Sequence, residues 1–221
     1  MKKLIETIKN IFKIEELRKR ILFTLALILV YRFGSFVVIP GINPESLSAL
    51  QQQVEGNGLM GLLNIFSGGA FSNASIFALG IMPYISASIV IQLMGIVVPY
   101  FQKLQKEGES GRRKINQWTR YLTIIVLLLQ GPAYLANLHA QLPDAAFVLG
   151  RGSVLFTIGA TIVLIAGTMF VMWLGEKITD KGIGNGVSLI IMVGIIARLP
   201  HALMAELNTR FTESTGGFVM L

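Results

Sequence analysis

Residues 76–100 read IFALGIMPYISASIVIQLMGIVVPY, a stretch of 25 residues without a single charged side chain. An α-helix needs about 20 mainly apolar residues to cross the hydrocarbon core of a bilayer. Four further apolar stretches lie along the chain, at residues 21–39, 118–138, 154–174 and 187–206. We therefore expect an all-α integral membrane protein with five transmembrane helices.

The composition supports a membrane protein. Of 221 residues, 53% are hydrophobic and 14% are charged, whereas an ordinary soluble domain has about 25% charged residues. The fifth stretch loses its apolar character after Ala197, so it spans the bilayer only if its helix continues through residues 201–207. A shorter buried or interfacial helix is the alternative.

The basic residues indicate the orientation of the chain. Fifteen of the 19 Lys and Arg residues lie in three segments, with seven in residues 1–20, six in residues 101–120 and two in residues 175–186. The positive-inside rule places these segments, and the N-terminus, in the cytoplasm. Residues 1–20 also have an amphipathic pattern, which predicts a cytosolic helix on the membrane surface.

Residues 59–75, LMGLLNIFSGGAFSNAS, contain a short apolar segment that Ser67, Gly68 and Gly69 interrupt. The segment is too short to cross a bilayer, and non-helical backbone survives at membrane depth only where protein or a water-filled cavity satisfies it. We expect a re-entrant hairpin that faces a cavity. A loop on the external surface is the alternative.

Two patterns in the spans have more than one interpretation. Ile81, Ile85 and Ile89 recur every four residues and share one helical face. They would form a narrow, dry constriction if they lined a pore, and they would equally suit a face toward lipid. Arg32 is the only charge inside a clear span, and it either pairs with the interrupted segment or extends toward the membrane surface.

We identify no catalytic, cofactor-binding or metal site. The chain has no cysteine. An intramembrane aspartyl protease needs a carboxylate at the fourth position of its GxGD motif, and the nearest match here, at residues 182–185, has the neutral amide of Asn185 at that position. The same glycine-rich segment fits no nucleotide-binding loop. Instead, we expect Asn185 near the N-cap of the fifth span.

The basic segment KLQKEGESGRRK, residues 103–114, has two central glycines and is expected to be a mobile, solvated loop. Its Lys and Arg side chains could bind the phosphates of ribosomal RNA, an acidic protein surface or anionic lipid headgroups. Membrane topology alone would also explain them. The candidate contact residues are Lys106, Arg112, Arg113 and Lys114.

Three segments of the chain resemble the SecY channel family. They are FSGGAFSNASIFALGIMPYISASIV at residues 66–90, KEGESGRRK at residues 106–114 and GTMFVMWLGEKITDKGIGNG at residues 167–186. The likeness runs in matching order from GINP at residues 41–44 to LP at residues 199–200. It implies the N-terminal half of a ten-span, pseudo-symmetric channel in the bacterial inner membrane, and no enzymatic activity.

The resemblance also implies site residues. Four aliphatic residues would form a pore ring around a translocating chain, namely Ile81, Ile85, Val187 and Ile191. Twelve would form a plug that closes the external side, namely Gly61, Leu62, Leu63, Asn64, Ile65, Phe66, Ser67, Gly68, Gly69, Ala70, Phe71 and Ser72.

The partners that the resemblance implies are SecE, SecG, the ribosome or the SecA motor, and the unfolded polypeptide with its signal sequence. The chain ends where a sixth span would begin, so the second half of the channel would come from another chain or from a further part of this one. The main alternative is half of an inverted-repeat transporter for a small solute. Arg32, Gln92 and Gln130 would serve such a site, but the clear spans contain no acid.

Overall fold

The computed structural model describes residues 14–56, 58–148, 150 and 153–212. The predicted surface helix at residues 1–20 therefore lies mostly outside the described residues, and residues 15–20 form the first turns of a longer helix. The helices are α2 (Glu15–Gly34), α3 (Leu47–Gly56), α4 (Gly58–Phe66), α5 (Met82–Val97), α6 (Pro99–Lys106), α7 (Glu109–Gln141), α8 (Val154–Lys181) and α9 (Gly186–Thr212), with short 3-10 turns at Pro44–Ser46 and Asp144–Ala146.

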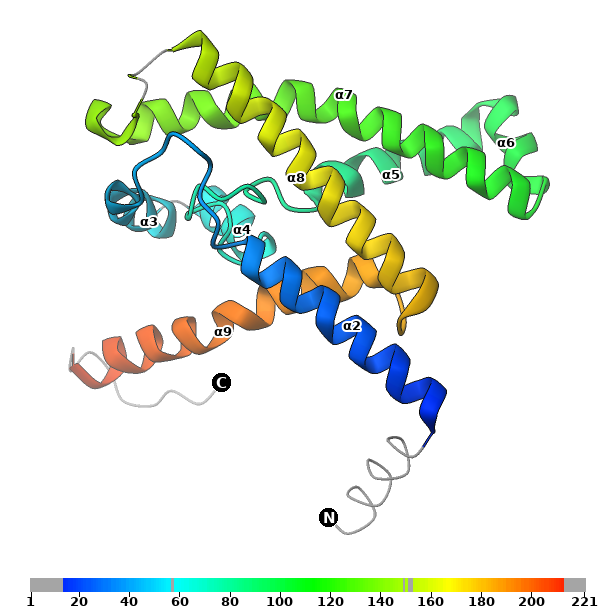
Figure 1. The fold of residues 1–221 in the computed structure, drawn as a ribbon, viewed down its shortest axis with the longest axis horizontal. Coiled ribbons are helices and arrows are strands. Elements are labelled where there is room, and N and C mark those ends of the chain that lie inside the picture. The colour runs from blue at the N-terminus through cyan, green and yellow to red at the C-terminus, as the bar shows by residue number, and fades with distance from the viewer. Residues whose placement is uncertain (1–13, 57, 149, 151–152, 213–221) are drawn as a thin grey trace.

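The all-α class is confirmed. Within the described ranges the only strand-like features are two isolated bridges, one of them between Val38 and Ser75. Helix α8 is the centre of the bundle, where it contacts α2, α7 and α9. Figure 1 shows α7 along one side of the molecule and α9 along the other, with α8 crossing between them.

Helices α7 and α8 are each long and apolar enough to cross a membrane. Helices α5 and α6 satisfy the same criteria only as a pair, which is bent by 98°. Helix α2 has only residues 21–31 between Arg20 and Arg32, and the apolar part of α9 ends at Pro200. Of the residues described, two helices, or three with the bent pair, thus qualify by length and composition, and the five-span count stays a prediction.

Helix α2 ends earlier than predicted and helix α5 begins later, because the chain segments beyond these two helix ends bond to each other. Helix α2 ends at Gly34 instead of residue 39, and α5 begins at Met82 instead of residue 76. The amide of Ile39 donates to the Ala74 carbonyl oxygen at 2.9 Å, and the Ile76 amide donates to the Val37 carbonyl oxygen at 2.9 Å. The two chain segments satisfy their backbone groups with each other instead of within helices.

The stretch expected to be a loop at residues 103–114 is mostly helical. Helix α5 stops before Pro99, which cannot donate a backbone hydrogen bond and instead begins α6. Between α6 and α7 only Glu107 and Gly108 are non-helical. The hairpin is tight, because a Cβ at Gly111 would lie 1.7 Å from the Leu104 carbonyl oxygen.

The connection from α8 to α9 agrees with the predicted helix start. The Asn185 side-chain oxygen accepts from the amides of Val187 at 3.0 Å and Ser188 at 3.3 Å, so Asn185 caps α9 as expected. Helix α8 extends past the predicted end at residue 174 to Lys181. Helix α9 continues through residues 201–207, as a fifth span would require.

Candidate functional site

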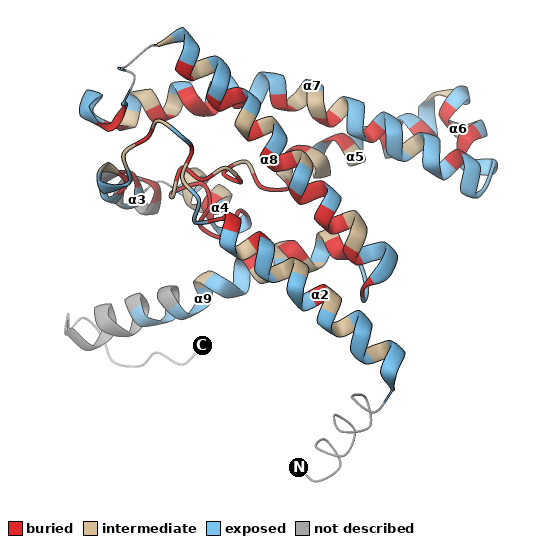
Figure 2. Ribbon diagram, viewed as in Figure 1, coloured by how far each residue is buried: buried red, intermediate tan, exposed pale blue. Residues whose placement is uncertain are grey.

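The chain between α4 and α5 contains a buried turn, which we define as residues 67–75. All of its residues are buried except the half-buried Asn73, and Figure 2 shows the connection between α4 and α5 largely in the colour of buried residues. Gly68 and Gly69 have φ angles of +66° and +92°. Such angles favour glycine, and α4 ends at Phe66, directly before the run of Ser67, Gly68 and Gly69 that the sequence predicted to interrupt a helix.

The buried turn is stabilised by its own polar groups and by those of Asn64 in the last turn of α4. The backbone oxygen of Asn64 accepts from the Gly69 amide at 2.9 Å, and the Asn64 side-chain oxygen accepts from the Ser72 amide at 3.1 Å. The Ser67 hydroxyl donates to the Asn64 carbonyl oxygen and accepts from the Phe71 amide, both at 3.1 Å. These bonds satisfy backbone groups that would otherwise be costly to bury.

Two buried tyrosines bind the turn from neighbouring helices. The Tyr31 hydroxyl of α2 donates to the Ser67 carbonyl oxygen at 3.2 Å. The Tyr134 hydroxyl of α7 donates to the Phe71 carbonyl oxygen at 2.9 Å, and the rings of Phe71 and Tyr134 make an edge contact at 5.0 Å. Residues 67–72 are therefore not a surface loop, whereas Leu62 in the helical part of the segment is 54% exposed.

Two arginines also contact the turn. Arg32 Nη1 donates to the Gly68 carbonyl oxygen at 2.9 Å, which is the pairing that the sequence left as one of two alternatives. Arg198 Nη2 of α9 donates to the Ser72 hydroxyl at 3.1 Å. Sequence reasoning assigned no role to Arg198, although its position just after an apolar stretch was the available signal.

The four predicted pore-ring residues share one hydrophobic cluster, which also includes residues of α2 and α8. Ile81 immediately precedes α5 and is 3% exposed, and Ile85 lies one turn later. Val187 and Ile191 lie one turn apart at the start of α9 and are half-buried. Ile89 continues the same face of α5 one turn after Ile85, but it lies outside the cluster and is 52% exposed.

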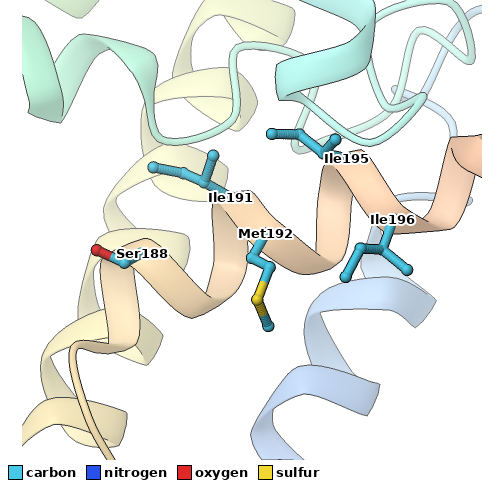
Figure 3. Close-up of a pocket in the computed structure, with 5 residues that line it drawn as sticks. All are labelled: Ser188, Ile191, Met192, Ile195 and Ile196. Atoms are coloured by element: carbon cyan, nitrogen blue, oxygen red, sulfur yellow. The ribbon is translucent and has the colours of Figure 1, made fainter.

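Two open pockets adjoin this cluster. The first, of about 220 Å³, is lined from α5 and from the start of α9, and Ile85 and Val187 both face it. The second, of about 360 Å³, lies along α9, and Figure 3 shows its lining side chains on different sides of that helix. The second pocket is lined by Ser188, Ile191, Met192, Ile195 and Ile196.

The predicted partner-contact residues lie far from the buried turn along the bundle. Lys106, Arg112, Arg113 and Lys114 are exposed on α6 and on the first turns of α7. Figure 1 shows this hairpin at the opposite end of α7 from α3. Surface ion pairs to Glu109 at 3.6 Å and Glu107 at 3.5 Å engage Arg113 and Lys114.

Known proteins resemble this chain in sequence and in fold. The family model for SecY matches residues 75–221. A protein translocase subunit SecY of Escherichia coli K12 is 50% identical over 188 residues, which cover 85% of this chain and 42% of that protein. The corresponding subunit of Streptomyces scabiei is 46% identical over 198 residues, which cover 87% of this chain and 45% of that protein.

Solved structures share the fold at low sequence identity. A structure described as a protein conducting channel matches with a TM-score of 0.56 and 17% identity, covering 88% of this chain and 41% of that one. Sec61 in the canine ribosome-channel complex matches with a TM-score of 0.54 and 17% identity, covering 88% of this chain and 42% of that one. The chain thus spans less than half the length of each of these four proteins. By sequence it belongs to the SecY family.

Proposed function

We propose that this chain forms the N-terminal half of the pore-forming subunit of a protein-conducting channel. The channel passes unfolded secretory polypeptides across the bacterial inner membrane and membrane segments into it. One observation carries the proposal: a buried, polar-stabilised turn lies beside a cluster that brings Ile81, Ile85, Val187 and Ile191 together. The SecY relatives favour this function over half of a solute transporter.

The aliphatic cluster suits a seal that binds nothing tightly. Branched apolar side chains offer a passing peptide no hydrogen bonds or charges, and a narrow apolar constriction excludes water and ions when it is empty. Ile81 and Ile85 from one side and Val187 and Ile191 from the other form this pore ring. Residues 61–72 form the plug on the external side of the ring.

The remaining architecture belongs to the same proposal. Five spans cross the membrane, with the N-terminus in the cytoplasm, and the second half of the channel completes the seal. SecE, SecG, the signal sequence of the passing chain, and either the ribosome or SecA are the partners. The exposed cations of the α6–α7 hairpin contact the cytosolic partner, and the energy for transport comes from that partner, so the channel itself is a passive conduit and not an enzyme.

Ion conductance tests the pore ring. In the complete channel, replacing Ile81 and Ile85 with glycine removes the apolar seal, so the resting channel should leak ions across a planar bilayer. Ile96→Gly is the matched control, because Ile96 lies on α5 but is 72% exposed. Unchanged conductance in the double variant, or an equal leak in the control, would contradict the assignment.

A further inference from the structure

The buried turn is bound by guanidinium groups from the first and the last described helices. Arg32 of α2 donates to the Gly68 carbonyl oxygen at 2.9 Å. Arg198 of α9 donates to the Ser72 hydroxyl at 3.1 Å, across 126 positions of sequence. The two contacts lie at the two ends of the segment from Gly68 to Ser72.

Two glycines make room for the two guanidinium groups. A Cβ at Gly68 would lie 2.8 Å from Arg32 Nη1, and a Cβ at Gly69 would lie 3.2 Å from Arg198 Nε and Nη2. The backbone can therefore approach each cation closely only because these positions have no side chain. The left-handed φ angles of both glycines turn the chain at the same place.

Whether the turn stays in place depends on which other hydrogen-bond acceptors the two arginines can reach. Hydrogen bonds from a charged donor are stronger than bonds between neutral groups. An arginine at membrane depth that loses its acceptor is costly unless another polar group replaces it. The carbonyl of Gly68 is an ordinary peptide oxygen, so water or another peptide backbone offers an equivalent acceptor.

We propose that Arg32 and Arg198 are positioning residues that latch the buried turn in its closed place. The latch releases when water or the backbone carbonyl groups of a passing polypeptide accept the hydrogen bonds of the two guanidinium groups in place of the turn. This inference rests on the proposed function, since it describes how the plug of that channel is held. It adds a reason why an unfolded chain, with its free carbonyl groups, opens the plug.

Cysteine labelling measures the latch directly. Because the chain has no cysteine, Ala70→Cys, at a position with 0% exposure, gives this chain its only thiol, which is then labelled in the complete channel in membranes. The rate at which this thiol reacts with a small maleimide reports how often the turn moves out of its buried position. Arg32→Gln and Arg198→Gln should each raise that rate about tenfold, because each loses a hydrogen bond from a charged donor, and the double variant should raise it further.

A matched control separates the latch from a general effect of losing an arginine. Arg120→Gln removes a guanidinium that binds Glu176 on α8 and does not contact the turn, so its labelling rate should equal that of the parent. Arg198→Lys keeps the charge but not the geometry, and its rate should fall between those of the parent and Arg198→Gln. A double arginine variant with the parental rate would overturn the latch.

A variant of the acceptor covers the case in which an arginine variant fails to assemble. Ser72→Ala removes the hydroxyl that Arg198 binds while leaving both arginines in place. It should raise the labelling rate of the Ala70→Cys thiol several-fold, and an unchanged rate would count against the latch.

The test also distinguishes the latch from the plug. With a polypeptide arrested in the channel, the parent carrying only Ala70→Cys should label faster than the resting channel. If the arrested chain has no effect, the plug assignment is wrong. If it accelerates labelling while the arginine and serine variants do not, the plug stands and only the latch is wrong.

Discussion

Gly194 of α9 lies directly against Gly68 of the buried turn. A Cβ at Gly68 would lie 2.9 Å from the Gly194 Cα, and a Cβ at Gly194 would lie 3.2 Å from the Phe66 carbonyl oxygen and 3.3 Å from the Gly68 nitrogen. The atoms met on both sides are backbone atoms, which cannot rotate away as the end of a flexible side chain can. Helix α9 and the turn therefore fit together only without side chains at this contact.

Gly194→Val should displace the buried turn, because its branched side chain occupies the space of the turn backbone. The labelling rate of a cysteine introduced by Ala70→Cys measures the displacement, and we expect it to rise several-fold. Gly159→Val in α8 is the control, since no atom lies within 4 Å of a Cβ at Gly159. Equal labelling in the two variants would show that the contact does not hold the turn.

Tyr134→Phe should destabilise the bundle by about 1–2 kcal/mol, because the buried Phe71 carbonyl oxygen loses its donor while the ring contact remains. Thermal unfolding in detergent provides the measurement. Tyr121→Phe, at a tyrosine that is 61% exposed, should leave the transition unchanged. If the Tyr134 variant is as stable as the parent, the hydrogen bond from Tyr134 to Phe71 does not stabilise the turn.

Arg120 of α7 and Glu176 of α8 form a two-bonded ion pair, at 3.2 Å from Nε and 2.5 Å from Nη2. The Arg120 side chain is 45% exposed and that of Glu176 is 20% exposed, so solvent screens the pair. A double-mutant cycle with glutamine at both positions should give a coupling of at most about 1 kcal/mol. The coupling should shrink as salt is raised, and one that is independent of salt would contradict a screened pair.

Membrane topology can be tested at two exposed positions. Under the proposed orientation, a single cysteine at Glu45 reacts with an impermeant thiol reagent added outside the cell, and one at Arg113 reacts only after the membrane is opened. Both side chains are exposed in the structure, so access depends on the side of the membrane and not on burial. The reverse pattern would invert the proposed orientation.

Features that arise from local composition could be predicted from the sequence alone. Apolar stretches predict helices because a backbone in hydrocarbon must satisfy its own hydrogen bonds. The run of Ser67, Gly68 and Gly69 predicted the end of α4, and Asn185 predicted the start of α9 through its side-chain cap. Each of these features depends on residues only a few positions apart, so the local sequence is enough to predict it.

Features that depend on contacts between distant residues became visible only in the folded chain. Hydropathy placed the second span at residue 76, but Ile76 and its neighbours bond with the segment around Val37, and α5 begins at Met82. The contacts of Arg32 and Arg198 with the turn join positions 36 and 126 residues apart. Backbone amides and charged side chains form hydrogen bonds with whichever acceptors folding brings close. Those acceptors lie in distant segments, and no periodic pattern in the sequence indicates which segments will meet.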